Sequence, residues 1–510
     1  MKQLNLNKLL TQALELHRNG NLDKADKIYL EILKNNPDDF DSNHLHAVVL
    51  AQKQGFQASI KYYEKAYKVN KNNCELLNNY GISLKNIKNY KKSEDIFNSA
   101  IDIDKSFTKT YINLGNCFAV QNKYDEALKI LDQGRRVDSS DIRFTKNIIG
   151  IYIEKFNKFK NNNDLFNCIE NLNQIDIDET FDQKLISNCA LVYLWNNDLD
   201  KSVDLFKIAE KKSQILPNLE TLTKMKDRSV LSYFVKHEYE QICHIDSDID
   251  GIRNMKITQK FFDHLETVNK KNYNNYSEND LRFISTIHTI KYNKPPKTKS
   301  PLINPKLDSK SIQNEYCTSN PQICVVDNLL TDSFHTDLNI FYRCANIFKR
   351  PYPRGYVGTF LGTGMANKPI LQFSLDLKNQ FPEIFRDYNL SQAWAFKYDS
   401  QQKGINIHAD DAKVNVNIWL TPESANLDED TGGLIIWKKK PDELATFQEF
   451  NSELNSEKMF KDVNNSDSIR VPYKANRAVI FDSKLYHATD SINFDSKYIN
   501  RRLNVTFLYS

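Results

Sequence analysis

The strongest constraint on the fold of this 510-residue chain is an internal repeat of 34 residues in its N-terminal part. Each unit carries a small residue, a second small residue 12 positions later, a large residue 4 further on and a fourth residue 3 beyond that. The four series are Ala13, Ala47, Gly81 and Gly115; Ala25, Ser59, Ser93 and Ala127; Tyr29, Tyr63, Phe97 and Leu131; and Ile32, Ala66, Ala100 and Gly134. This period predicts stacked helical hairpins, because one hairpin cannot bury its apolar face alone.

The residue types also predict how each hairpin packs. Small residues let the two helices of a unit approach closely, and the large side chain fills the space beneath them. The same offsets recur at Ala190, Ser202, Phe206 and Ala209, whereas the register slips between about residues 150 and 183. The pattern resembles the tetratricopeptide repeat over about residues 5–212. It implies an α-solenoid that is either a spacer or a groove for a protein or peptide.

Composition excludes several classes of protein. Charged residues make up 26% and hydrophobic residues 40%, which is typical of globular domains. The net charge is only +4, so basic and acidic residues are too closely balanced to favour nucleic acid as a partner. The sequence contains no apolar run long enough to span a membrane and no secretory leader, and its 8 cysteines form no CxxC pair. These features predict a cytoplasmic protein without a membrane partner.

Four regions are expected along the chain. The solenoid occupies residues 1–212, and a helical extension follows at 213–293. Residues 294–320 are rich in proline and lysine and are predicted to be a linker. Residues 321–510 contain three of the four tryptophans and several β-rich runs, so they are predicted to form a separate, mostly β domain.

A candidate metal site lies in this last region. Histidine is followed two positions later by an acidic residue four times, and three of these pairs lie in helical pattern, where the two side chains point about 200° apart. His408 and Asp410 instead follow a predicted strand at 404–407, and alternate residues of a strand share a face. His487 is the other histidine beyond residue 390 and is the expected third ligand. Such a set suits Fe(II) with open positions for a cosubstrate and O₂, and it also serves zinc hydrolases.

The final strand offers an anchor for a carboxylate. Arg502, Asn504 and Thr506 alternate with apolar residues and are expected to share the inner face of a barrel. A guanidinium in that position needs a partner, and a bidentate carboxylate suits it. Arg501 is the alternative cation.

Two earlier strands supply further candidates for the same cavity. Tyr398 shares a strand face with Trp394 and Phe396, and it is either a hydrogen-bond donor to the cosubstrate or a core residue. Asn415, Asn417 and Trp419 share a face of the next strand. Asparagines pointing into a barrel need partners, so both are candidates to line the site.

Taken together, these residues resemble the 2-oxoglutarate/Fe(II)-dependent oxygenase superfamily, especially its prolyl-hydroxylase-like members. The matching pieces run in the family's order over about residues 321–510: 325–330, Tyr398, 408–410, 431–434, 476–482, His487 and 502–504. The resemblance implies a double-stranded β-helix, a cupin-like jelly roll with flanking helices, C-terminal to the solenoid. It implies Fe(II) on His408, Asp410 and His487, with 2-oxoglutarate held by Arg502, Asn504, Tyr398 and Asn417. Trp419, Asn415 and Arg501 would lie around this site, and ascorbate is a further candidate cofactor.

The implied activity is hydroxylation of a protein or peptide through an Fe(IV)-oxo intermediate, with the repeats binding the substrate or a partner. The alternatives are the same chemistry on a small molecule, or a repeat scaffold with an inactive barrel. Two departures leave the substrate branch open. Collagen-type prolyl hydroxylases usually anchor the cosubstrate with lysine, where this chain has Arg502. The nucleic-acid dealkylating branch has a further arginine where this chain has Leu508.

Overall fold

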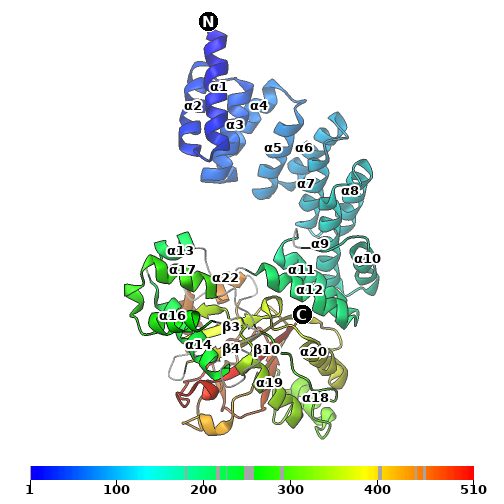
Figure 1. Cartoon of the computed structure of the whole chain (residues 1–510). Coiled ribbons are helices and arrows are strands. Elements are labelled where there is room, and N and C mark those ends of the chain that lie inside the picture. The colour runs from blue at the N-terminus through cyan, green and yellow to red at the C-terminus, as the bar shows by residue number, and fades with distance from the viewer. Residues whose placement is uncertain are drawn as a thin grey trace. The chain divides into compact units, whose positions relative to one another are not determined.

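The computed structural model describes residues 2–178, 181–213, 219–225, 227–245, 258–287, 292–399, 405–442, 445–451 and 455–510. The chain divides into two compact units, Met1–Ile175 and Asp176–Ser510. The helices of the first unit are α1 (Lys2–Arg18), α2 (Leu22–Asn35), α3 (Phe40–Gln54), α4 (Phe56–Val69), α5 (Cys74–Asn86), α6 (Tyr90–Ile103), α7 (Thr108–Ala119), α8 (Tyr124–Val137), α9 (Ile142–Phe159) and α10 (Asn162–Leu172) (Figure 1). No helix among the described residues is long and apolar enough to cross a membrane.

The first unit is a tetratricopeptide-like solenoid of helical hairpins. Consecutive helices pair, α1 with α2 and so on to α9 with α10, and each hairpin packs on the next. A Cβ atom on Gly81 would lie 2.5 Å from the ring of Phe97, and one on Gly115 would lie 2.8 Å from Leu131. The predicted pairing of a small residue with a large side chain is therefore confirmed. Helix α9 has 18 residues, against 12 to 15 in α2–α8, and this longer helix accounts for the slipped register.

A further hairpin, α11 (Gln183–Trp195) and α12 (Leu199–Lys212), belongs to the second unit. The indole Nε1 of Trp195 donates to the carbonyl of Leu390 at 2.8 Å, and Nε2 of Gln183 donates to the carbonyl of Gly362 at 3.1 Å. This hairpin continues the repeat in sequence, but the contacts place it with the β domain.

The segments between the hairpin and the sheets are mostly helical. The described helices are α13 (Leu219–Lys224), α14 (Ser229–Ile245), α16 (Gln259–Asn269), η1 (Tyr273–Asn275) and α17 (Glu278–Ile287). The segment predicted to be a linker, 294–320, contains α18 (Ser309–Thr318), and Ile303 forms a β-bridge with Leu330. The side chain of Leu302 is buried, so this segment is part of the folded unit.

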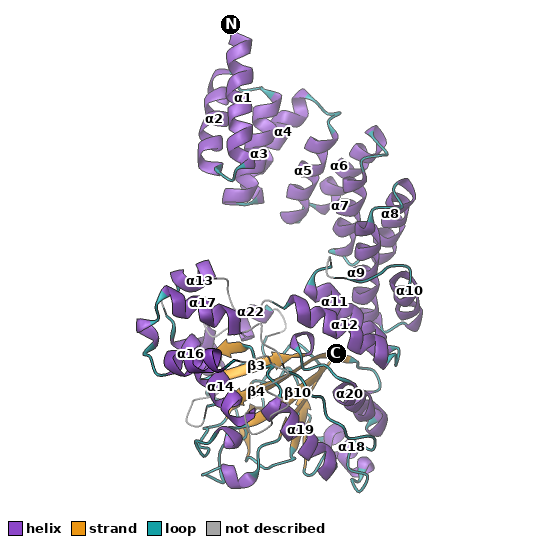
Figure 2. Ribbon diagram, viewed as in Figure 1, coloured by secondary structure: helices purple, strands orange, loops and turns teal. Residues whose placement is uncertain are grey.

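Two antiparallel sheets form the β domain. Figure 2 shows strands in orange, with β3, β4 and β10 labelled. The strands are β1 (Ile323–Val326), β2 (Arg350–Tyr352), β3 (Tyr356–Phe360), β4 (Leu390–Tyr398), β5 (Val414–Trp419), β6 (Leu434–Trp437), β7 (Ser468–Val471), β8 (Ala478–Asp482), β9 (His487–Thr489) and β10 (Leu503–Tyr509). The larger sheet has the order β1-β8-β5-β10-β4-β3-β2, and the smaller has β7-β6-β9. The final strand, β10, thus lies between β4 and β5, in the middle of the larger sheet.

An apolar core joins the facing sides of the two sheets. Phe396, Tyr398 and Phe481 of the larger sheet cluster with Leu434 and Ile436 of the smaller one. The opposite face of the larger sheet is covered by helices that include α19 (Asp332–Cys344), α20 (Lys368–Gln380) and α21 (Pro382–Phe385). Polar side chains on the inner face of β10 therefore lie between the sheets, where water is excluded.

Candidate metal centre

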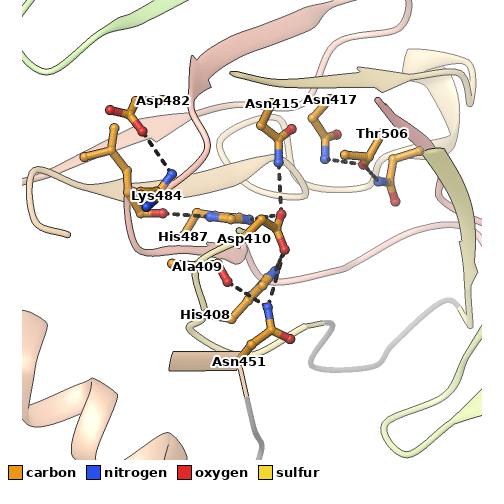
Figure 3. A network of polar contacts seen from close by, with 12 residues as sticks. His408, Ala409, Asp410, Asn415, Asn417, Asn451, Asp482, Lys484, His487 and Thr506 are labelled. Carbon is orange, nitrogen blue, oxygen red and sulfur yellow. Dashed lines mark hydrogen bonds and ion pairs between the residues drawn. The ribbon is translucent and has the colours of Figure 1, made fainter. Parts of the chain in front are cut away.

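The three predicted ligands come together between the sheets (Figure 3). Their ligand atoms lie within 4.8 Å of one another. Nε2 of His408 is 4.0 Å from Oδ1 of Asp410, and Nε2 of His487 is 3.5 Å from Oδ2 of the same carboxylate. Two imidazole nitrogens and one carboxylate on one side of a cavity can bind a divalent transition metal and leave positions open.

The backbone before His408 differs from the prediction. Residues 405–407 form no strand, and residue 404 lies outside the described part of the chain. The carbonyl of Asn406 is 2.7 Å from Nδ1 of His408, so it bonds this ring and not a neighbouring strand. His408 is aligned by a single β-bridge to His487, with backbone N–H···O distances of 3.0 and 2.8 Å. The ligands therefore converge through this bridge, not through a regular strand.

The hydrogen bonds of the two rings fix their tautomers. Nδ1 of His487 is 2.9 Å from the carbonyl of Leu485, which matches the contact of His408 with Asn406. A carbonyl can only accept, so each Nδ1 carries the proton and each Nε2 keeps its lone pair. Both lone pairs are directed toward Asp410, as metal ligation requires.

Electrostatics favour the metal-binding protonation states. Burial, together with the neighbouring His487, lowers the pKa of His408 to about 4. Burial raises the pKa of Asp410, but its contacts with His487 and His408 outweigh this effect and leave the pKa below its ordinary value. Asn415 and Asn451 also donate to the Asp410 carboxylate, at 3.2 and 3.4 Å. At neutral pH the carboxylate is therefore ionised and His408 is neutral.

Arg502 is a buried cation in the same cavity. Only 1% of its surface is exposed, and its guanidinium donates to the carbonyls of Gly432 (2.6 Å) and Gly433 (3.3 Å) and to Oδ1 of Asn504 (3.3 Å). Its guanidinium carbon is 4.8 Å from the centre of the Tyr398 ring. Within the described chain, Arg502 has no carboxylate partner. Because a buried charge without a counter-ion is costly, this position suits an anionic ligand.

Amide and hydroxyl groups line the space beside Arg502. Asn504 and Asn417 both donate to Oγ1 of Thr506, at 3.3 and 3.1 Å. Since this oxygen accepts twice, the hydroxyl proton of Thr506 can be donated to a ligand. Oδ1 of Asn417 and Oδ1 of Asn415 are buried and have no hydrogen-bond partner among the described residues. Such orphaned polar atoms indicate a site built for a polar ligand.

One narrow cavity of about 30 Å³ connects the two groups. It is lined by the three candidate metal ligands and by Arg502, Asn504 and Thr506, and also by Tyr398, Asn417 and Thr489. An outer cleft of about 510 Å³ shares the lining residues Trp394, Phe396 and His408 with this cavity. Aromatic side chains form part of the wall of this cleft, among them Tyr352, Tyr356, Phe360, Trp394 and Phe396. A narrow inner cavity therefore lies beside a wider outer cleft.

Two of the predicted site residues do not line the cavity, although the ring centre of Trp419 lies 6.0 Å from the guanidinium carbon of Arg502. Arg501 points away from the cavity and pairs with Glu240 of α14, with 2.5 Å between Nη2 and Oε2. Consecutive residues of an extended chain face opposite sides, so Arg501 and Arg502 cannot both reach the cavity. Trp419 stacks on Tyr473, with 5.3 Å between ring centres, and is not among the lining residues.

Two contributors were absent from the prediction. Thr489 lines the cavity two positions after His487 on β9, and the alternation of strand faces could have identified it. Asn451, which bonds Asp410, lies in α22 (Phe447–Asn451), and no local pattern of the sequence links it to the site.

Comparisons with known proteins bear on the helical part alone. No family model matches the chain, and no curated protein matches it. Solved structures with similarity include PilF of Pseudomonas aeruginosa (16% identity, 40% of this chain and 89% of that one, TM-score 0.34). A tetratricopeptide repeat protein from Parabacteroides merdae (15%, 43% and 82%, TM-score 0.33) and MamA from Desulfovibrio magneticus RS-1 (14%, 34% and 97%, TM-score 0.30) are also similar. The description of the first unit as a solenoid rests on its own hairpins and their 34-residue spacing.

Proposed function

We propose that this protein is a 2-oxoglutarate- and Fe(II)-dependent dioxygenase that hydroxylates a protein or peptide, with the repeats as the module that binds substrate or a partner. The observation that supports this proposal is the pairing, in one cavity, of a ligand-ready His/Asp/His set with a buried arginine that has no acidic partner among the described residues. Iron bound there would couple the oxidative decarboxylation of 2-oxoglutarate by O₂ to oxygenation of a C–H bond in the substrate.

Each group along the cavity has a role in this proposal. His408, Asp410 and His487 would hold the iron, because their Nε2 and carboxylate atoms lie within 4.8 Å of one another. Arg502 would bind the distal carboxylate of 2-oxoglutarate with charge-assisted hydrogen bonds, and the Thr506 hydroxyl is available to assist it. The aromatic walls of the outer cleft would keep bulk water from the reacting groups.

The competing zinc hydrolase does not account for all of these features. Two histidines and a carboxylate serve zinc equally well, so the metal ligands alone do not separate the two reactions. A hydrolase would leave the buried guanidinium of Arg502 without a counter-ion in the resting protein, whereas a dicarboxylate cosubstrate neutralises it. The buried Arg502, and not the set of metal ligands, therefore separates the dioxygenase from the zinc hydrolase.

The test compares two cosubstrates that differ in the distal carboxylate. Under anaerobic conditions the Fe(II)-loaded protein should develop a weak visible charge-transfer band with 2-oxoglutarate, and His408→Ala should abolish it. Wild-type protein should bind 2-oxoglutarate more tightly than 2-oxovalerate, which lacks the distal carboxylate, and Arg502→Leu should remove this preference. Arg386→Leu is the matched control, because the side chain of Arg386 is 65% exposed and absent from the cavity. No band, together with no succinate formed in air, would count decisively against the proposal.

The role of the repeats needs a separate measurement. Removing Met1–Ile175 should leave the uncoupled conversion of 2-oxoglutarate to succinate intact. Hydroxylation of a protein in cell extract, detected as a gain of one oxygen atom, should then be lost if the solenoid delivers the substrate. Retained hydroxylation of the protein would show that the unit Asp176–Ser510 recognises the substrate without the solenoid.

A further inference from the structure

Helix α14 presents a polar face to the two strands that carry the carboxylate anchor. Nζ of Lys236 is 2.8 Å from Oδ2 of Asp399, and Oε2 of Glu240 is 2.5 Å from Nη2 of Arg501. Between them, Nε2 of His237 lies 3.2 Å from Nζ of Lys397. Residues 236, 237 and 240 share one side of the helix, so these three contacts form one polar interface.

The contacted residues flank the anchor on both strands. Lys397 and Asp399 stand on either side of Tyr398, and Arg501 immediately precedes Arg502. Tyr398 and Arg502 are themselves joined across the strands, because the N–H of Tyr398 donates to the carbonyl of Arg502 at 2.9 Å. Consecutive residues of an extended chain point to opposite faces. Helix α14 therefore holds the reverse side of the two backbone segments whose front side faces the cavity.

Burial makes these contacts specific. Lys397 and His237 have no exposed surface, and Arg501 is 3% exposed. Helix α19 adds to the interface, since Nη2 of Arg343 donates to the carbonyl of Arg501 at 3.1 Å. Breaking a buried ion pair leaves an uncompensated charge, so the backbone at Arg501 is expected to shift when its partner is removed. Because the adjacent residue is Arg502, such a shift reaches the anchor directly.

We propose that α14 positions the Tyr398–Arg502 pair for a dicarboxylate ligand, with Glu240 and Lys236 as positioning residues that never touch the ligand. The inference rests on the proposed function for the identity of that ligand. It makes the helical extension part of the machinery of the site, not a spacer between the repeats and the β domain.

The decisive measurement is the affinity ratio of two ligands. We would titrate full-length protein, loaded with redox-inert Mn²⁺, with 2-oxoglutarate and with 2-oxovalerate by calorimetry. Glu240→Gln should weaken 2-oxoglutarate binding on the order of tenfold, within the usual range of coupling between sites, and leave 2-oxovalerate unchanged. Lys236→Met should weaken 2-oxoglutarate binding by roughly two- to threefold, because the Lys236–Asp399 pair is more exposed than the Glu240–Arg501 pair. Glu278→Gln is the control: it removes a Glu–Arg pair on the exposed surface of α17.

A second readout does not depend on the ligand. Amide hydrogen exchange across residues 395–399 and 501–505 should be faster in Glu240→Gln than in wild type, and unchanged in Glu278→Gln. Folded variants that keep both the wild-type affinity ratio and wild-type exchange would overturn the inference. If Glu240→Gln does not fold, Lys236→Met decides, since 44% of that side chain is exposed. If wild-type protein shows no preference for 2-oxoglutarate, the proposed function fails, and exchange alone decides the role of α14.

Discussion

Replacing Gly433 by alanine tests how tightly the backbone behind Arg502 is packed. A Cβ atom there would lie 1.9 Å from the carbonyl oxygen of Val471 and 3.0 Å from the amide nitrogen of Tyr473. Both are backbone atoms, so neither can rotate away as a side chain could. The carbonyl of Gly433 also accepts a hydrogen bond from Nη2 of Arg502. The substitution must therefore displace the turn that supports the buried guanidinium.

The expected magnitude follows from two effects. Forcing an extra carbon into a packed interior costs about 1–3 kcal/mol. A lost hydrogen bond to a charged group costs a further 1.5–3 kcal/mol or so. The free energy of unfolding of the second unit should fall by about 2.5–6 kcal/mol, a large share of the roughly 5–15 kcal/mol typical of a folded domain. Affinity for 2-oxoglutarate should fall as well, because Arg502 loses one of its supports.

Tryptophan fluorescence provides the assay. All four tryptophans (Trp195, Trp394, Trp419 and Trp437) lie in the unit Asp176–Ser510, so fluorescence during urea unfolding reports on that unit alone. Gly150→Ala is the matched control, because it lies within α9 and a Cβ there would meet no atom within 4 Å. It should stabilise the first unit by up to about 1 kcal/mol, visible in far-UV circular dichroism but not in fluorescence. A Gly433→Ala protein with the wild-type urea midpoint and slope would refute the argument.

Three further predictions concern pH, domain boundaries and a buried ion pair. Burial lowers the pKa of His44 to about 4, so the unfolded state binds more protons between pH 4 and 6.5. The free energy of unfolding of the first unit should therefore fall as the pH drops through this window, by up to about 1.4 kcal/mol per pH unit, and His44→Gln should flatten the far-UV profile. A fragment of residues 176–510 should unfold cooperatively. A fragment of residues 213–510 lacks α11 and α12 and should unfold at a lower temperature. Equal unfolding temperatures for the two fragments would contradict the boundary at residue 176. Lys349→Met should destabilise the second unit by about 3–5 kcal/mol in urea, because it leaves Glu238 buried and unpaired, and adding Glu238→Leu should restore most of the loss.

Local periodicity made much of the architecture predictable. The spacing of Gly81 and Phe97 indicates a hairpin because the packing of the helices repeats with the backbone, and the Phe97 ring does fill the space where Gly81 has no side chain. The alternation of Arg502, Asn504 and Thr506 with apolar residues gives their shared face, because a strand has a period of two. Both signals lie within a short stretch of chain.

Other features depend on partners far away in the sequence. The hairpin α11–α12 carries the same repeat signature as its predecessors, yet Trp195 and Gln183 contact the β domain. The segment before His408 has an apolar pattern suited to a strand, but the carbonyl of Asn406 bonds the His408 ring, and the pairing with β9 is limited to an isolated bridge between His408 and His487. In each case a tertiary contact overrides a local preference of about 1 kcal/mol or less.

The sequence by itself determined the helical solenoid, the β-rich C-terminal region and the residue types suited to a metal and a carboxylate. Only the tertiary structure decided that His408 and His487 meet through one β-bridge, that Arg502 and not Arg501 faces the cavity, and that Glu240 of α14 pairs with Arg501. The physical reason is that backbone periodicity assigns a residue to a face of its own element, whereas the packing of distant elements decides what that face meets.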